Sequence, residues 1–189
     1  GTKWSEAKPI AGKAILLSSL GTVMTAGLVG LFCHFALNVA LLESLLIGAV
    51  ISSTDAASVF SILRSKRLNL RYNTASLMEV ESGSNDPFSY MLTVILLSLM
   101  NGQGSGGEVA YMLFAQIVYG AAFGVGIAIL ALLVLKKFKI ASAGFDAIFI
   151  VAVAILAYAA PTAVGGNGYL SVYIAGIILG NHRIQNKQA

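Results

Sequence analysis

The chain has 189 residues, of which 57% are hydrophobic and only 11% are charged, and its mean hydropathy is +0.83. Soluble domains carry about 25% charged residues, so this composition excludes an ordinary soluble domain and indicates a membrane protein with several spans. The formal net charge is +4, but the basic residues lie in short clusters between apolar runs. That pattern is typical of topology signals and argues against a nucleic-acid partner.

The apolar runs predict six helices, because a spanning helix needs about 20 apolar residues. No run shows sustained alternation of polar and apolar residues, so strands are not expected. The predicted fold class is therefore an all-α polytopic membrane protein. The six expected helices cover roughly Ala14–Leu37, Val39–Leu63, Thr74–Met100, Val109–Leu135, Phe145–Ala160 and Tyr169–Asn181.

The distribution of Lys and Arg predicts the orientation of these helices. With six spans, every basic cluster falls on one side of the membrane, and the loops on the other side contain no Lys or Arg. The positive-inside rule places both termini in the cytoplasm, and we expect a plasma membrane, the inner membrane of a bacterium. The basic residues are Lys3, Lys8, Lys13, Arg64, Lys66, Arg67, Arg71, Lys136, Lys137, Lys139, Arg183 and Lys187.

Four consecutive polar residues, Ser52 to Asp55, interrupt the second expected helix. Their side chains can bond to the local backbone and compete with helical hydrogen bonds, so we expect an unwound segment near Thr54 and Asp55. Such a segment at membrane depth offers backbone carbonyls and helix ends to a cation. Ser52, Ser53 and Ser58 are expected only to bond to the preceding turn, whereas an acid in a span has no such use.

A second polar stretch, residues 81–87, lies in the third expected helix. Asp86 is about 12 residues from the expected cytoplasmic end, or roughly 18 Å, which is near the middle of a bilayer. Ser82 lies four residues earlier and shares its face. Pro87 has no N–H and leaves the carbonyl of Gly83 without its helical donor. With the amide oxygen of Asn85, these groups suit a partly dehydrated alkali cation, which prefers oxygen ligands.

Asp86 is the residue predicted to exchange ions. A carboxylate removed from water favours its protonated form, so Asp86 can hold a proton when no cation is bound. One carboxylate that takes either ion is the minimum machinery for cation/proton exchange. The expected partners are a potassium or sodium ion, a proton and the lipid bilayer, and no cofactor is expected.

The two other acids of this helix have different expected roles. Glu81 shares a face with Asn85, and since no Lys or Arg lies within the expected spans, it is protonated or its cationic partner lies elsewhere. Glu79 is nearer the cytoplasmic end, where it could guard the inner entrance or simply reach interfacial water.

Two other functions fit the composition less well. An intramembrane aspartyl protease, the enzyme alternative, would need Tyr-Asp and Gly-x-Gly-Asp, whereas here Asp55 follows Thr54 and Asp86 follows Asn85. A cation channel would not need a single protonatable carboxylate at the middle of the membrane.

Glycines in the fourth and sixth expected helices predict close contacts between helices. Packing within the chain is the favoured interpretation, and a dimer contact is the alternative. These glycines are Gly120, Gly124, Gly126, Gly176 and Gly180.

The two polar stretches resemble the motifs of monovalent cation/proton antiporters of the electroneutral, NhaP-like branch. Thr54-Asp55 resembles the family's unwound crossing, and the E-S-x-x-N-D motif is matched from Glu81 to Asp86. The residues of these motifs are most similar to those of the family's potassium/proton antiporters, and residues 165–181 also resemble a later helix of the family. Ala56 stands where many members have Pro, which leaves the sharpness of the break open.

The resemblance implies a role for each of these residues. Asp86 would be the exchanging carboxylate, and Asn85 in place of a second Asp goes with one-for-one exchange. Thr54, Asp55 and Ser82 would shape the site, with the alkali cation at Asp86 and Thr54. Glu81 would pair with an Arg on a core helix of the family's second half.

The resemblance also implies an inverted-repeat fold with about twice as many helices and a homodimer as the assembly. The chain is therefore expected to be a fragment that covers one half of that fold. Within it, residues 1–100 would be the first trio of core helices, residues 101–137 an outer loop and a connector helix, and residues 138–189 helices of the interface domain.

Overall fold

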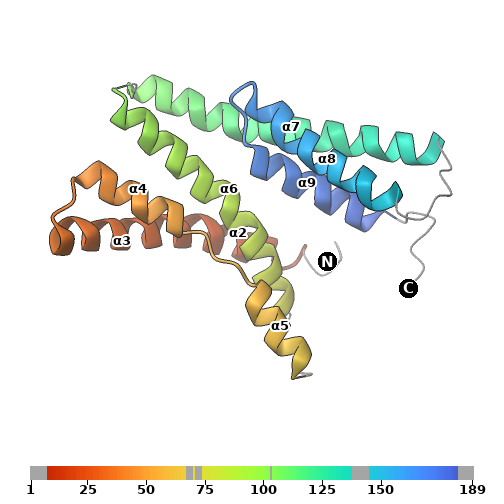
Figure 1. Ribbon diagram of the computed structural model, residues 1–189, viewed down its shortest axis with the longest axis horizontal. Helices are drawn as coiled ribbons and strands as arrows, with labels where there is room; N and C mark the ends of the chain where they lie inside the picture. Colours follow the sequence, from red (N-terminus) through yellow and green to blue (C-terminus); the bar gives the residue numbers. More distant parts are fainter. Residues whose placement is uncertain (1–7, 67–69, 71–73, 103, 138–144, 183–189) are drawn as a thin grey trace. The chain divides into compact units, whose positions relative to one another are not determined.

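The computed structural model describes residues 8–66, 70, 74–102, 104–137 and 145–182. Within these ranges the regular secondary structure is entirely helical (Figure 1). The chain forms two compact units, Gly1–Ala110 and Tyr111–Ala189. Some residues used to predict the orientation lie outside the described part: Lys3, the side chain of Arg64, Arg67, Arg71, Lys139, Arg183 and Lys187.

The first predicted helix is confirmed as a continuous helix, Ala11–Leu37. It consists of α2 (Ala11–Leu16), a π-helical turn η1 (Leu17–Gly21) and α3 (Thr22–Leu37). The helix ends at Asn38, whose φ of 53° is left-handed. Asn tolerates that conformation better than most residues, and the reversal starts the next helix within a few residues.

The second predicted helix is interrupted, as expected. It consists of α4 (Leu41–Ile51) and α5 (Ala57–Ser65), with residues 52–56 outside both helices. The third predicted helix is α6 (Thr74–Met100), which continues through Pro87. The remaining elements are α7 (Gly106–Lys137), α8 (Phe145–Thr162) and α9 (Gly168–Asn181).

By length and composition, two of the described helices are long and apolar enough to cross a membrane, Ala11–Leu37 and Gly106–Lys137. Shorter apolar helices accompany them at Leu41–Ile51, Ala147–Thr162 and Gly168–Asn181. The 27 residues of α6 span about 40 Å. This helix also carries three acids, Glu79, Glu81 and Asp86, which set it apart from the other long helices.

In the first unit, α3 and α4 lie against each other through small residues (Figure 1). A Cβ added to Gly48 would run into the carbonyl of Ala26, and one added to Gly30 would lie 3.0 Å from the Cα of Leu45. Small residues let two backbones approach closely, which supplies van der Waals contact in a setting where water provides little driving force. In turn, α6 packs against α2, η1 and α4.

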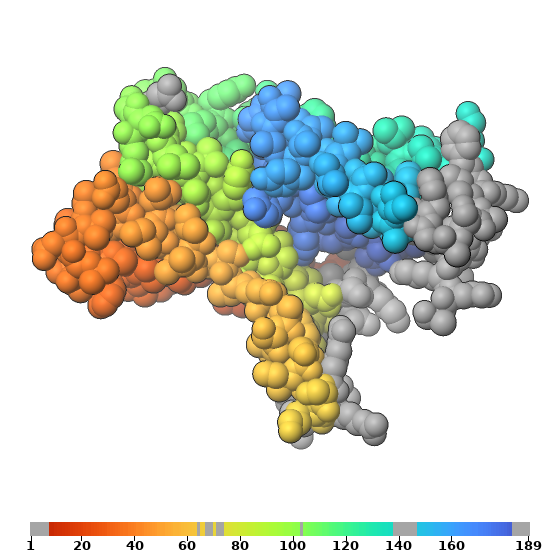
Figure 2. Space-filling model, viewed as in Figure 1, coloured from red at the N-terminus to blue at the C-terminus, as the bar shows by residue number. Residues whose placement is uncertain are grey.

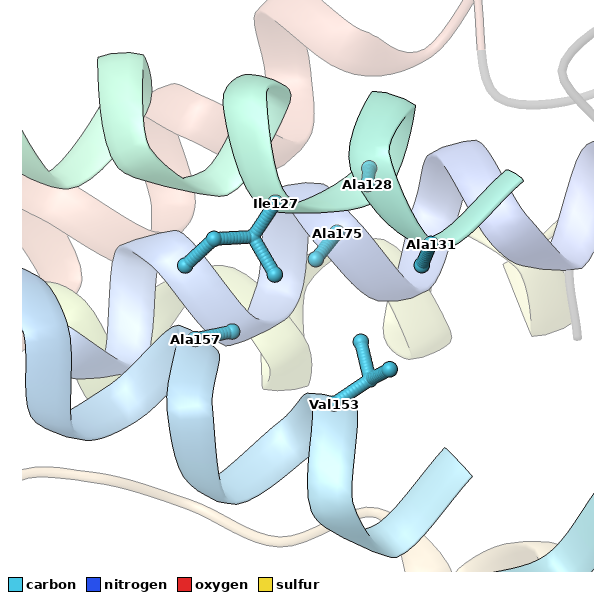
Figure 3. Close-up of a cluster of buried hydrophobic side chains, with 6 residues drawn as sticks. All are labelled: Ile127, Ala128, Ala131, Val153, Ala157 and Ala175. Carbon is cyan, nitrogen blue, oxygen red and sulfur yellow. The ribbon is translucent and has the colours of Figure 1, made fainter. Parts of the chain in front are cut away.

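In the second unit, apolar side chains of α7, α8 and α9 point toward one another and form a core (Figure 3). On the same helices, Gly120 lies against the backbone of Asn167, and Gly124 lies against the backbone of Ser171. The core residues are Ile127, Ala128, Ala131, Val153, Ala157 and Ala175.

The prediction of intramolecular glycine packing is therefore confirmed for Gly120 and Gly124. At Gly126, Gly176 and Gly180, an added Cβ would meet no described atom within 4 Å, so a dimer contact there stays a prediction. The predicted division into residues 1–100, 101–137 and 138–189 also stays a prediction. The second compact unit contains most of α7 together with α8 and α9.

The close contact between α3 and α4 leads to a stability prediction. Gly48→Ala is expected to destabilise the protein by about 1–3 kcal/mol, because the new Cβ forces two backbones apart. Gly27→Ala is the matched control: it lies within α3, and its Cβ would meet no described atom within 4 Å. The control should keep or raise stability, since Ala is the better helix former. Thermal unfolding of the purified protein in detergent compares the two; equal midpoints would contradict the prediction.

Candidate functional site

The site is built around the end of α4, where the carbonyl of Ala49 receives donors from two elements. It accepts hydrogen bonds from the backbone N–H of Ser52 at 3.3 Å and from the hydroxyl of Ser52 at 2.7 Å. The hydroxyl of Ser89, on α6, donates to the same oxygen at 2.7 Å. The bonding of Ser52 to the preceding turn is thus confirmed. Ser89, which the sequence did not single out, anchors the end of α4 to α6.

Asp55 determines where α5 begins. Its Oδ1 accepts a hydrogen bond from the backbone N–H of Ala57 at 2.9 Å. An acid at this position satisfies an N–H that lacks a helical partner and interacts favourably with the positive end of the helix dipole. The carbonyl of Ala56 accepts from the N–H of Phe60 at 2.9 Å, which closes the first turn. Figure 2 shows α5 extending away from the α3–α4 pair on the far side of this break.

Side chains of α6 bind the backbone of the break itself. The hydroxyl of Ser82 donates to the carbonyl of Thr54 at 3.0 Å and accepts from the N–H of Ala56 at 3.1 Å. The amide of Asn85 donates to the same carbonyl at 3.1 Å and to the Thr54 hydroxyl oxygen at 2.7 Å. Backbone groups released by unwinding need new partners, and these two side chains supply them.

Asn85 links the break to Glu81. Only 1% of Asn85 is exposed, and its Nδ2 also lies 3.3 Å from Oε1 of Glu81. The predicted shared face of these two residues is confirmed. The two amide hydrogens of Asn85 are therefore distributed among three oxygens, those of Thr54 and that of Glu81. Glu81 thus has a neutral hydrogen-bond donor within the first unit.

Ser53 contradicts one prediction. Its hydroxyl does not bond to the preceding turn; it donates to Oδ1 of Asp86 in a short contact and lies 3.3 Å from Oδ1 of Asn85. The reason is local: the helix ends at Ile51, so Ser53 lacks the helical geometry that makes bonding to the preceding turn easy. The sequence signal for this different behaviour was the position of Ser53 just after the end of α4, in the stretch expected to unwind.

The break therefore collects oxygen atoms of several kinds in one place. The carboxylate of Asp86, the amide oxygen of Asn85 and the hydroxyl of Ser53 come together, with both oxygens of Thr54 bound to the same amide. Asp86 and Thr54 are exposed on the surface of the unit, whereas Asn85 is buried. A fixed amide beside an accessible carboxylate is an arrangement that can take up a cation or a proton.

The remaining predicted site residues lie around this centre. Asp55 borders it from the start of α5, and Pro87 is buried in α6. Glu79 is exposed on α6, on the N-terminal side of Glu81. The availability of the Gly83 carbonyl stays a prediction, as does the role of Glu79 at an inner entrance.

A family model described as "Sodium/hydrogen exchanger, transmembrane" matches residues 2–189. The chain belongs to the sodium/hydrogen exchanger family. The predicted membership of a cation/proton antiporter family is thereby confirmed, and the all-helical fold agrees with an integral membrane protein.

Similar proteins are named as antiporters of two kinds. The chain is 37% identical to the K(+)/H(+) antiporter NhaP of Alkalimonas amylolytica, over 90% of this chain and 30% of the relative. It is 33% identical to the K(+)/H(+) antiporter NhaP2 of Shewanella oneidensis, over 93% of this chain and 31% of the relative. It is 24% identical to the Na(+)/H(+) antiporter NhaS2 of Synechocystis sp., over 98% of this chain and 33% of the relative. The chain thus spans about a third of the length of these relatives.

The bonds of Ser82 to the break make its removal measurable. Ser82→Ala is expected to lower the free energy of unfolding by about 1–3 kcal/mol, because the Ala56 N–H and the Thr54 carbonyl each lose a partner. Ser82→Thr keeps a hydroxyl and should lose less, while Ser58→Ala, at an exposed position on α5, should change little. Thermal unfolding in detergent ranks the three variants, and an unchanged midpoint for Ser82→Ala would show that these bonds do not stabilise the break.

Proposed function

We propose that the protein exchanges a monovalent cation for a proton across a membrane, with Asp86 as the carboxylate that binds each ion in turn. The observation that carries this proposal is the position of Asp86 at the break between α4 and α5, where Ser53 and Asn85 lie beside its carboxylate. Family membership supports it, as do the relatives named as antiporters.

Competition between the two ions follows from the chemistry of one carboxylate. When the cation is bound, Asp86 is ionised and its charge is balanced by the ion; when the cation leaves, a proton takes its place. Both occupied states carry the same net charge at the site. Asn85 contributes an oxygen but no charge, so the exchange moves one cation for one proton and no net charge.

The helix ends at the break favour a positive ion. The C-terminal end of α4 carries partial negative charge from the helix dipole. The opposite charge at the start of α5 is offset by Asp55, whose carboxylate accepts from the N–H of Ala57. The field of the break is thus biased toward cations, and Thr54 lies between the two helix ends.

The wider organisation is proposed on the same basis. Residues 1–100 form a core that carries the site, residues 101–137 a connector, and residues 138–189 part of a dimer interface. Glu81 anchors α6 through Asn85 and pairs with an Arg outside this chain, and Glu79 lies at the inner entrance. Both termini of the chain face the cytoplasm at a plasma membrane. Potassium is the favoured cation, because several similar proteins are named as potassium/proton antiporters.

Asp86→Asn tests the central role directly. The variant keeps the size of the side chain but cannot bind a proton or balance a cation, so cation-driven pH change should fall to the level of vesicles without the protein. The assay uses everted membrane vesicles containing the full-length protein and a fluorescent pH indicator. Glu43→Gln removes a charge at an exposed position in the first turn of α4 and should retain exchange. Exchange at the normal rate by Asp86→Asn would refute the proposal.

One-for-one coupling predicts that transport leaves the membrane potential unchanged. Proteoliposomes with an outward potassium gradient should take up protons, and a potential-sensitive dye should give no signal that scales with turnover. Collapsing the potential with a membrane-permeant anion such as thiocyanate should leave the potassium-driven rate unchanged. A transport rate that changes with the membrane potential would contradict one-for-one coupling.

A further inference from the structure

Resting on the proposed exchange at Asp86, we infer that the Ser53 hydroxyl is a direct oxygen ligand of the transported cation and helps to set the affinity for it. The same hydroxyl contacts both the Asp86 carboxylate and the Asn85 amide oxygen.

The first argument is the position of the hydroxyl. It contacts one oxygen of Asp86 and one oxygen of Asn85, so it brings three oxygens of different kinds close together where α6 meets the break. The Asp86 and Asn85 oxygens can only accept hydrogen bonds, and a serine hydroxyl has only one hydrogen to donate. It is donated to the charged oxygen, since hydrogen bonds to carboxylates are the shorter and stronger ones. The contact with Asn85, at 3.3 Å, is correspondingly long.

The second argument compares Ser53 with the hydroxyl of Thr54. The carbonyl of Thr54 already accepts from Ser82 at 3.0 Å and from Asn85 at 3.1 Å, and its hydroxyl oxygen accepts from Asn85 at 2.7 Å. Among the described residues, the Ser53 hydroxyl oxygen donates toward Asp86 and Asn85 but accepts no hydrogen bond. The lone pairs of Ser53 are therefore the ones that a cation can use without breaking a bond that holds the chain.

The third argument is that Ser53 can change role without moving the backbone. A hydroxyl hydrogen rotates about the bond between Cβ and Oγ, so it can turn away when a cation enters and expose a lone pair. Ser53 is half-buried and contacts both the buried Asn85 and the exposed Asp86. Hydroxyl, amide and carboxylate oxygens are all hard ligands of the kind that alkali cations prefer.

Kinetics of exchange separate a ligand from a residue that only supports the fold. Ser53→Ala is expected to raise the apparent KM for potassium about fivefold while the maximal rate stays within about twofold of normal, because one ligand of ordinary hydrogen-bond strength is lost. Ser53→Thr restores a hydroxyl at the same position and should bring KM back toward normal. Ser58→Ala, at the exposed position on α5, is the control and should leave both parameters unchanged.

The assay uses everted vesicles with the full-length protein at one fixed pH, over a range of potassium concentrations, with protein amounts matched by immunoblot. If Ser53→Ala does not accumulate, Ser53→Cys keeps the size of the side chain but offers a soft sulfur that binds alkali cations poorly, and it should show the same rise in KM. An unchanged KM, or a fall in maximal rate alone, overturns the inference. Loss of exchange in Asp86→Asn together with a normal KM in Ser53→Ala would reject the role of Ser53 and leave the proposed function standing.

Discussion

The structure depends on how the backbone groups between α4 and α5 are satisfied. Backbone N–H and carbonyl groups released by unwinding are costly to leave unpaired, and here partners for them come from α6. Ser82 bonds to a carbonyl and an N–H of the break, Asn85 bonds to both oxygens of Thr54, and Ser89 bonds to the end of α4. The break therefore depends on its own polar residues and on the side chains of α6 together.

The same bonds explain why the carboxylate lies where it does. Asn85 and Asp86 are adjacent on α6, so fixing the first against Thr54 also fixes the position of the second. Asn85 is buried while Asp86 is exposed, so the helix presents one residue to the backbone and the next to the surface. The residue that holds the break and the exposed carboxylate are thus neighbours in the sequence. A substitution at Asn85 therefore changes the support of the break and the position of the Asp86 carboxylate at once.

Much of this arrangement could be predicted from the sequence, and the parts that could not have physical reasons. The helices were predictable because long apolar runs leave few alternatives in a membrane, and Ser52 to Asp55 marked the break because four polar residues compete with helical bonding. The meeting of the break with Ser82 and Asn85 could be expected from the resemblance to an antiporter family. The contact of Ser89 could not, because a serine in a helix normally bonds to its own preceding turn. For Ser53, the end of the helix at Ile51 explains why it does not bond to the preceding turn, but its contact with Asp86 depends on where α6 lies, which is a matter of tertiary structure.

The π turn at Leu17–Gly21 changes which residues of the first helix share a face. Each residue turns an α-helix by about 100°, so one extra residue in a turn shifts all that follows it to a different face. Residues of α2 and α3 consequently do not share one repeating stripe, although they belong to a continuous helix. The extra residue rotates α3 without lengthening the loops or breaking the span. Deleting one residue here would rotate Ala26 and Gly30 away from α4 while leaving the local hydrophobicity unchanged.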